Sequence, residues 1–352
     1  MKKITPLLIF ALGFLMITSS CDKSDSEDNN DTSAFYKVVN KGNAGVTSIS
    51  DLDDAVGLSV AQAIPSVSNR AYPANMPILF FLDDKILLSS ITEDNFIVTE
   101  NDIKMKGIVS ISEASNGYAI LSYIPERQFA ANANIKIVLT TDLLDDAGMG
   151  NTQDTTIEYT TTASNNSSFI GNTGFESGDE GVNFVGDGNI LTGTQGCVAP
   201  FGGSSFGAIT TGLQLISGDN AIGEASSIMI LGPISNNVSS VSFNYNFLSA
   251  EFQEYVGSEY DDSFMAIVVG GNGAHSEFVT SVNTIGIDGN TSCNAFPGMP
   301  DNGDAYFGST GWVNKQINFD SVGDSAYVIF IVTDVTDAIY SSIVCIDDVN
   351  FN

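Results

Sequence analysis

The chain contains a single histidine, His275, and this limits the nucleophilic and metal chemistry available to it. A Ser-His-Asp or Cys-His mechanism would have to use this residue, and a histidine-rich zinc site is excluded by the count. His275 follows the glycine-rich residues 270–274, which are typical of a loop. We therefore expect His275 to be solvated, with no catalytic role.

Carboxylates are the more abundant reactive groups, because the chain holds 42 Asp and Glu residues. Glycoside hydrolysis needs two carboxylates on either side of the scissile bond. Glu251 and Glu254 invite comparison with the jelly-roll glucanases, but the Glu-x-Asp-x-x-Glu strand signature of that class is absent. We therefore expect a protein that is not an enzyme, and a glycan hydrolase is the alternative.

Aromatic side chains are the usual contacts of a sugar-binding site. Tyr255 and Tyr260 flank an acidic loop and are the candidate ligand-binding residues. Trp312 is the only tryptophan and follows Gly311 at an expected strand start, so we expect it in the core.

The chain has four cysteines, and three of them follow the expected signal segment. Cys345 lies inside the apolar run 342–346, where a buried free thiol is ordinary. Cys197 and Cys293 both lie in loops rich in Gly, Asn or Pro, and these two residues are predicted to form a disulfide in an oxidising compartment.

The remaining cysteine, Cys21, ends an N-terminal export segment. Lys2 and Lys3 precede an apolar run over residues 6–17, which is too short to span a membrane. The small residues 18–20 before Cys21 resemble the lipobox of bacterial lipoproteins, although Thr18 stands where that motif usually has Leu. The resemblance implies a cleaved signal peptide over residues 1–20 and lipidation of Cys21.

The ten residues after Cys21 are all polar and five of them are acidic, so they cannot build a core. An acidic run at this place resembles the surface-export signal of Bacteroidota lipoproteins. The resemblance implies an outer-membrane lipoprotein facing the cell exterior.

Charge narrows the range of partners. The whole chain has 12 basic and 42 acidic residues, and from Ser164 onward there are 21 acids against Lys315 alone. Such a surface repels phosphate backbones and anionic headgroups. Nucleic acid is therefore excluded as a partner, and membrane contact is expected only through the lipid anchor.

The pattern from residue 64 to 163 predicts a small β-sandwich. Short β-branched or aromatic runs recur between polar turns about every ten residues, as in all-β folds. These runs are residues 78–82, 96–98, 107–111, 118–123 and 135–139. With an Asp-x-x-Gly-Asn-type element at residues 145–151, they resemble the bacterial Ig-like domain of the S-layer type. The resemblance implies a stalk over residues 63–163, after a tether and linker over 21–62.

The remainder, residues 169–352, predicts a second and larger sandwich with its own core. Residues 241–249 alternate in polarity as a half-buried strand does. The opening Asn-x-Gly-Phe-Glu at residues 172–176 and the closing Ile-Asp-Asp-Val at residues 346–349 resemble carbohydrate-binding-like jelly-rolls and the choice-of-anchor domains of bacterial surface proteins. These resemblances imply an all-β fold and no assigned activity.

The same resemblance implies a structural calcium ion, because such modules often bring the opening loop and the last strand together around Ca²⁺. Glu176, Asp179 and Asp348 are the implied ligands, and Ca²⁺ accepts such oxygen donors. Asp347 and Asp348 should point to opposite faces of an alternating strand, so only one can face the opening loop. Asp348 is the one we expect.

We therefore expect a non-enzymatic surface lipoprotein in which an Ig-like stalk holds out a calcium-stabilised jelly-roll. The jelly-roll is expected to bind a glycan or a surface protein. The alternative is a glycan hydrolase or an accessory lipoprotein of a glycan-uptake system.

Overall fold

Nearly all regular structure in this protein is β, as the sequence predicts. The structure is a computed structural model, and it describes residues 35–41, 44–49, 57–65, 71–113, 119–163, 171–212, 226–234, 238–252, 254–285, 290–293, 307–323, 325–335 and 340–352. The lipidation residue Cys21, the signal segment and the linker expected at residues 164–168 lie outside these ranges.

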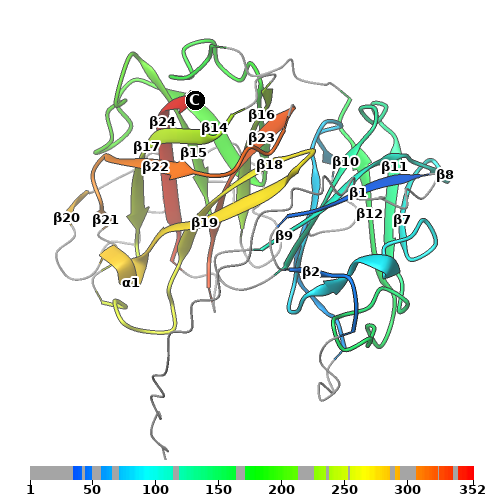
Figure 1. The fold of residues 1–352 in the computed structure, drawn as a ribbon. Helices are drawn as coiled ribbons and strands as arrows, with labels where there is room; N and C mark the ends of the chain where they lie inside the picture. The colour runs from blue at the N-terminus through cyan, green and yellow to red at the C-terminus, as the bar shows by residue number, and fades with distance from the viewer. Residues whose placement is uncertain are drawn as a thin grey trace, which may run out of the picture. The chain divides into compact units, whose positions relative to one another are not determined.

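The first half of the chain forms two facing five-stranded sheets, coloured blue to teal in Figure 1. One sheet has the order β1 (Tyr36–Asn40), β9 (Gly107–Glu113), β10 (Ala119–Pro125), β5 (Ile78–Leu82) and β3 (Val60–Ile64). The other has the order β4 (Ala71–Tyr72), β12 (Thr155–Thr161), β11 (Asn134–Leu139), β7 (Phe96–Glu100) and β8 (Ile103–Lys104). Two short strands, β2 (Gly45–Val46) and β6 (Ile86–Leu87), pair beside them and are followed by a 3-10 turn, η1 (Leu88–Ser90).

The five expected apolar runs all form strands, and β5 is buried along its whole length. One boundary differs from the expectation. Residues 21–62 were expected to be tether and linker, yet β1 pairs with β9 in parallel, and β3 begins at Val60. Tyr36 explains the difference, because its buried ring packs against Phe96 and Tyr123 at centroid distances of 5.7 and 5.9 Å.

The second half forms another two-sheet sandwich, green to red in Figure 1. The first of its sheets has the order β13 (Val182–Val185), β16 (Ser227–Ile234), β23 (Ala326–Thr333), β18 (Ser263–Gly270) and β19 (Gly273–Ser281). The second has the order β14 (Asp187–Thr192), β15 (Ser205–Thr210), β24 (Ser342–Phe351), β17 (Ser240–Ser249), β21 (Phe307–Ser309) and β20 (Asn290–Cys293). A further strand, β22 (Val313–Asn318), also pairs with β17, and one short helix, α1 (Val282–Ile285), follows β19.

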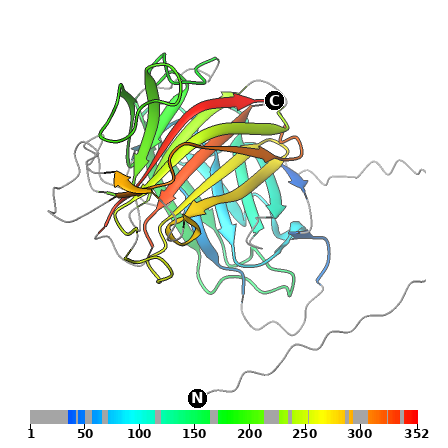
Figure 2. The ribbon, with the colours of Figure 1, turned by 90° about the vertical axis from the view of Figure 1, so that its left-hand side faces the viewer.

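The strands β17 and β24 are the centre of this second sheet, and Figure 2 shows β24 in red alongside its antiparallel partner. Phe243 of β17 lies in the core against Phe330 of β23, with ring centroids 4.8 Å apart. Because strand side chains alternate, the neighbours of Phe243 point to the outer face of the sheet. That outer face carries the polar rows and the Phe201–Trp312 pair described below.

The two sandwiches do not have fully separate cores, whereas the second was expected to have its own core. Ile228 and Ile230 of β16 and Ile329 of β23 belong to the same buried cluster as the first sandwich. The Ala274 amide also donates to Ser112 Oγ at 2.9 Å. Sequence periodicity shows that a strand is buried but not which sheet covers it.

Candidate functional site

The predicted residues Tyr255 and Tyr260 lie together in the loop between β17 and β18. Their ring centroids are 5.4 Å apart in an edge-to-face arrangement, and Tyr340 packs against Tyr255 at 5.8 Å. All three side chains are partly exposed. We call Tyr255, Tyr260 and Tyr340 the tyrosine cluster. Tyr340 was not predicted, since only the pairing of β17 with β24 brings it to this loop.

The loop that carries Tyr255 and Tyr260 is fixed to α1 by one residue. Asn283 Oδ1 accepts the Gly257 N–H, its Nδ2 donates to the Ser258 carbonyl at 3.2 Å, and its own N–H donates to Asp261 Oδ1 at 2.7 Å. The Tyr260 N–H donates to Ser258 Oγ at 3.1 Å. Residues 257–261 of the loop are therefore held in place.

The acidic residues around the cluster divide into two groups. Glu251 and Asp262 are buried, and the Val335 N–H donates to Asp262 Oδ1 at 3.0 Å. Glu254 and Glu259 are exposed. Glu251 and Asp262 therefore have a structural role, whereas Glu254 and Glu259 make the surface around the tyrosine rings acidic.

Glu176, one of the implied calcium ligands, accepts hydrogen bonds from the segment just before β15. Its carboxylate accepts the Ser204 N–H at 2.7 Å, the Ser204 hydroxyl at 2.6 Å and the Ser205 N–H at 2.9 Å. The Ser204 hydroxyl and amide hold the pKa of Glu176 below its ordinary value. The opening loop is thus tied to the segment just before β15.

The acid of β24 that faces this region is Asp347, whereas Asp348 was expected. Asp347 Oδ2 accepts the N–H groups of Phe201 and Gly202 at 2.8 and 3.0 Å, and its side chain is fully buried. Burial raises the pKa of Asp347 more than these amides lower it. A β-carbon added to Gly174 in the opening loop would lie 3.6 Å from Asp347 Oδ1.

Asp348 lies instead in an irregularity of β24. Its φ is 50°, and the pairing with β17 shifts register between Ser242 and Asn244. Its carboxylate accepts from Asn350 Nδ2 at 3.0 Å and from Asn244 Nδ2 at 3.4 Å. The simple alternation argument was wrong here because a bulge inserts an extra residue.

The implied ligands are not brought together by these contacts. Glu176 accepts from Ser204 and Ser205, Asp348 faces β17, and Asp179 lies in a turn where its carbonyl accepts the Val182 N–H at 3.0 Å. Within the described ranges, no group of three or more His, Cys, Asp or Glu side chains could hold a metal ion. Calcium binding therefore stays a prediction, and this geometry does not fit it.

An aromatic pair beside Asp347 was not predicted as a site. Phe201 has 51% of its surface exposed, and its ring centroid lies 6.0 Å from that of Trp312. Trp312 in turn contacts the buried Phe206 at 6.1 Å and donates from Nε1 to the Ala199 carbonyl at 2.9 Å. Trp312 was expected in the core, but it is only partly buried and covers a small hydrophobic cluster on the outer face of the sheet.

The cysteines agree in part with the expectation. Cys345 is a free thiol, and its complete burial raises the pKa of that thiol. Cys197 is disulfide-bonded. The side chain of Cys293 lies outside the described part of the structure, so the pairing Cys197–Cys293 stays a prediction.

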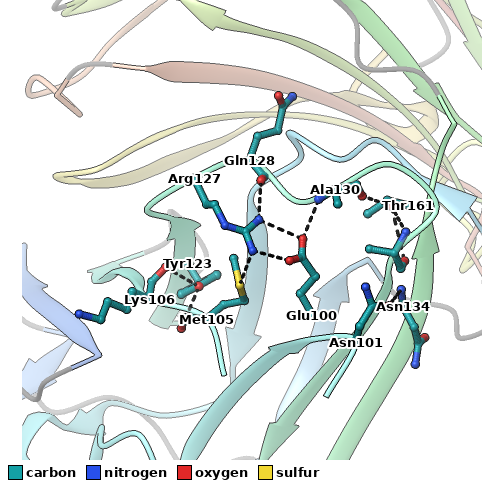
Figure 3. A network of polar contacts seen from close by, with 11 residues as sticks. Glu100, Asn101, Met105, Lys106, Tyr123, Arg127, Gln128, Ala130, Asn134 and Thr161 are labelled. Atoms are coloured by element: carbon teal, nitrogen blue, oxygen red, sulfur yellow. Dashed lines mark hydrogen bonds and ion pairs between the residues drawn. The ribbon is translucent and has the colours of Figure 1, made fainter. Parts of the chain in front are cut away.

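Figure 3 shows a network of polar contacts within the first sandwich, centred on Glu100 and Arg127. The Arg127 guanidinium binds both carboxylate oxygens of Glu100, with Nη1 to Oε1 at 3.1 Å. The Ala130 N–H also donates to Glu100 Oε1 at 2.6 Å. These contacts lower the pKa of Glu100, chiefly through Arg127. The network joins β7 to the segment after β10 and has a structural role.

No family model matches this chain, and no curated protein matches it. Similar solved structures include the carbohydrate-binding module TmCBM61 in complex with β-1,4-galactotriose. It is 14% identical with a TM-score of 0.29, and the match covers 53% of this chain and 98% of the module. A second is the K1 cleaved adhesin domain of Lys-gingipain from Porphyromonas gingivalis W83, at 13% identity, TM-score 0.29, and 49% and 95% coverage.

A third is from a study of carbohydrate-binding modules of the β-sandwich superfamily. It is 12% identical with a TM-score of 0.27, and the match covers 85% of this chain and 99% of that one. These scores are low, so the similarity carries no argument about ligand or activity. The β-sandwich assignment rests on the sheets of this chain itself. Among the described residues, no helix is long and apolar enough to cross a bilayer.

Proposed function

We propose that this protein is a non-enzymatic binding module that recognises a glycan or another surface component through its second sandwich. The observation that carries the proposal is the tyrosine cluster, in which the partly exposed rings of Tyr260 and Tyr340 lie 5.4 and 5.8 Å from that of Tyr255, beside a loop that Asn283 holds in place. Aromatic faces stack against the apolar faces of sugar rings, and a site that is already ordered binds at a lower entropic cost.

The N-terminal features complete the proposal. The lipobox-like residues before Cys21 support anchoring through a lipid, and the acidic tether supports a place on the outer face of the outer membrane. The first sandwich would act as the Ig-like stalk. The calcium role implied for Glu176, Asp179 and Asp348 is left out of this proposal, because the described residues bring no three such ligands together.

Binding is tested on a glycan array with the full chain carrying Cys21→Ser, which removes the lipid. Tyr255→Ala and Tyr260→Ala should each weaken binding about tenfold or more, as central aromatic contacts do. Phe278→Ala is the matched control, because Phe278 is 49% exposed on β19, outside the cluster. Equal binding by all four proteins, or no binding by the parent, would contradict the proposal.

The same samples distinguish binding from hydrolysis. New reducing ends appearing in the bound glycan would favour the hydrolase alternative. The anchor is tested separately by labelled palmitate, which should enter the wild-type protein and not Cys21→Ser. Protection of the protein from proteinase K on intact cells would argue against a surface location.

A further inference from the structure

The outer face of the second sheet carries two rows of small polar side chains across three adjacent strands. Pairing places Asn244 of β17 opposite Asp347 of β24 on one side and Asn314 of β22 on the other. The next row places Ser242 opposite Asn350 and Gln316. We call Asn244, Asn314, Gln316, Asp348 and Asn350 the amide face.

Four side chains of the amide face are connected to one another, and the fifth, Gln316, donates from Nε2 to Asn318 Oδ1 at 2.9 Å. Asn314 Nδ2 donates to Asn244 Oδ1 at 3.3 Å, and Asn244 Nδ2 donates to Asp348 Oδ2 at 3.4 Å. Asn350 Nδ2 donates to Asp348 Oδ1 at 3.0 Å. These contacts orient the amides, while Asn314 and Gln316 remain exposed to solvent.

Strand propensity gives no reason for this composition. Asn is among the residues that strands disfavour, because strands prefer β-branched and aromatic side chains. A departure from local preference that packing does not explain is expected at functional positions. Here Asn314 and Gln316 are exposed on β22, so packing does not require them.

The aromatic pair Phe201 and Trp312 borders the amide face. Phe201 is tied to the first row, because its N–H donates to Asp347. Trp312 lies two residues before Asn314 and immediately precedes β22. Asp347 and Glu176 hold the backbone of residues 201–205, so the exposed ring of Phe201 is fixed beside the amides.

We propose that the amide face, together with Phe201 and Trp312, binds a neutral saccharide. Each amide offers one donor group and one acceptor without a charge, which suits the neighbouring hydroxyls of a sugar. The aromatic rings suit the apolar face of the same sugar. This inference rests on the proposed function and deepens it, since it names a second surface and the class of ligand.

Charge excludes the acidic glycans from this surface. Lys315 is the only basic residue from Ser164 onward, and its Nζ binds Glu277 Oε1 of β19 at 2.5 Å. An anionic sugar would meet Asp348 on the amide face and an acidic domain around it. A neutral sugar meets neither penalty.

The amide face and the tyrosine cluster can be separated by mutation. Asn244 lies five residues before Ser249, the last residue of β17, which corresponds to about 17 Å along a strand. The loop with Tyr255 and Tyr260 begins only after Ser249. The test uses the full chain with Cys21→Ser and a panel of neutral oligosaccharides that includes β-1,4-galactotriose. Matched sulfated and uronic-acid oligosaccharides form the second arm.

Asn314→Ala with Gln316→Ala, and separately Phe201→Ala, should weaken binding of the neutral oligosaccharides about tenfold or more. All three residues are exposed, so melting temperature should not change, and Phe278→Ala should bind as the parent does. Unchanged affinity in these variants, with loss in Tyr255→Ala, would overturn this inference and leave the proposed function standing. Preference for the anionic arm would also overturn it. A parent protein that binds no glycan on either arm would remove the proposed function for glycans and this inference with it.

Discussion

One buried carboxylate in each sandwich is compensated in a different way. In the first, Glu100 of β7 meets the guanidinium of Arg127. In the second, Asp347 of β24 meets the backbone N–H groups of Phe201 and Gly202. Amides stand there in place of a cation, in a sandwich whose only basic residue is Lys315.

The difference has a consequence for function. Arg127 joins β7 to the segment after β10, whereas Asp347 accepts backbone amides and fixes the path of a loop. In the second sandwich the fixed loop is the one that carries the exposed Phe201. Asp347 therefore positions a candidate ligand-binding surface, while Glu100 stabilises the fold of the first sandwich.

The largest effect is expected for Asp347→Ala. The change removes the fully buried Asp347 carboxylate and, with it, the acceptor of the Phe201 and Gly202 amides, so the free energy of unfolding should fall by about 3 kcal/mol. Urea denaturation measures it. Glu176→Ala is the matched control, because Glu176 also accepts from loop amides but is exposed, and water can replace it. Equal losses in the two variants would show that burial does not matter here.

A smaller loss is expected for Arg127→Ala in the first sandwich. Glu100 would keep the Ala130 amide but lose its cation, so the free energy of unfolding should fall by about 1–2 kcal/mol. Lys136→Ala is the control and should have no measurable effect, since both members of the Lys136–Glu158 pair are exposed to solvent. If Lys136→Ala proved as costly as Arg127→Ala, the role given to the buried carboxylate would be wrong.

The pH dependence of the two buried acids should have opposite signs. Arg127 lowers the pKa of Glu100 in the folded state. The contribution of Glu100 to the free energy of unfolding is therefore complete above its unfolded-state pKa of about 4.3, and it is lost as pH falls through its folded-state pKa. The pKa of Asp347 is raised by burial, so protonation on lowering the pH towards about 3.9 favours the folded state. Melting temperatures between pH 7 and pH 3 test both signs.

Each acid has its own variant in that experiment. The difference in melting temperature between the parent and Glu100→Gln should shrink as pH falls below about 4.3. The parent should gain stability relative to Asp347→Asn as pH falls through the raised pKa of Asp347. Curves that stay parallel would mean that neither acid titrates differently in the folded and unfolded states.

The smallest effect is expected from calcium. The oxygens of Glu176 and Asp347 already accept N–H groups, so Ca²⁺ and Mg²⁺ should raise the melting temperature equally, through screening of the acidic surface. Thermal melts in EGTA, Ca²⁺ and Mg²⁺ at matched ionic strength make the comparison. A rise specific to Ca²⁺ would support the ligand set implied by the sequence, Glu176, Asp179 and Asp348.

Much of the fold could be predicted from the sequence. The run 78–82 forms β5 over the same residues, and the alternating run 241–249 forms β17 with one residue added. Periods and turn residues are local properties, so a single sequence reveals them. The strand β1 was missed, because its burial depends on a parallel partner about seventy residues later.

The candidate site could be predicted only in part. Tyr255 and Tyr260 were named as candidates from their places beside the acidic loop, and the structure adds their contact, whereas Tyr340 is brought to them through the pairing of β24 with β17. The sequence also placed the opening loop near the last strand. It could not say which acid faces that loop, because the positive φ of Asp348 interrupts the alternation.

By itself, then, the sequence determined the all-β class, the strong negative charge, the single histidine and the positions of several of the longer strands. Tertiary structure alone decided the amide rows, since Asn244, Asn314 and Asp347 meet through strand register. It also decided that Phe201 is exposed and fixed in place by Asp347. Register and bulges depend on hydrogen bonds between segments far apart in the chain, and no local pattern encodes them.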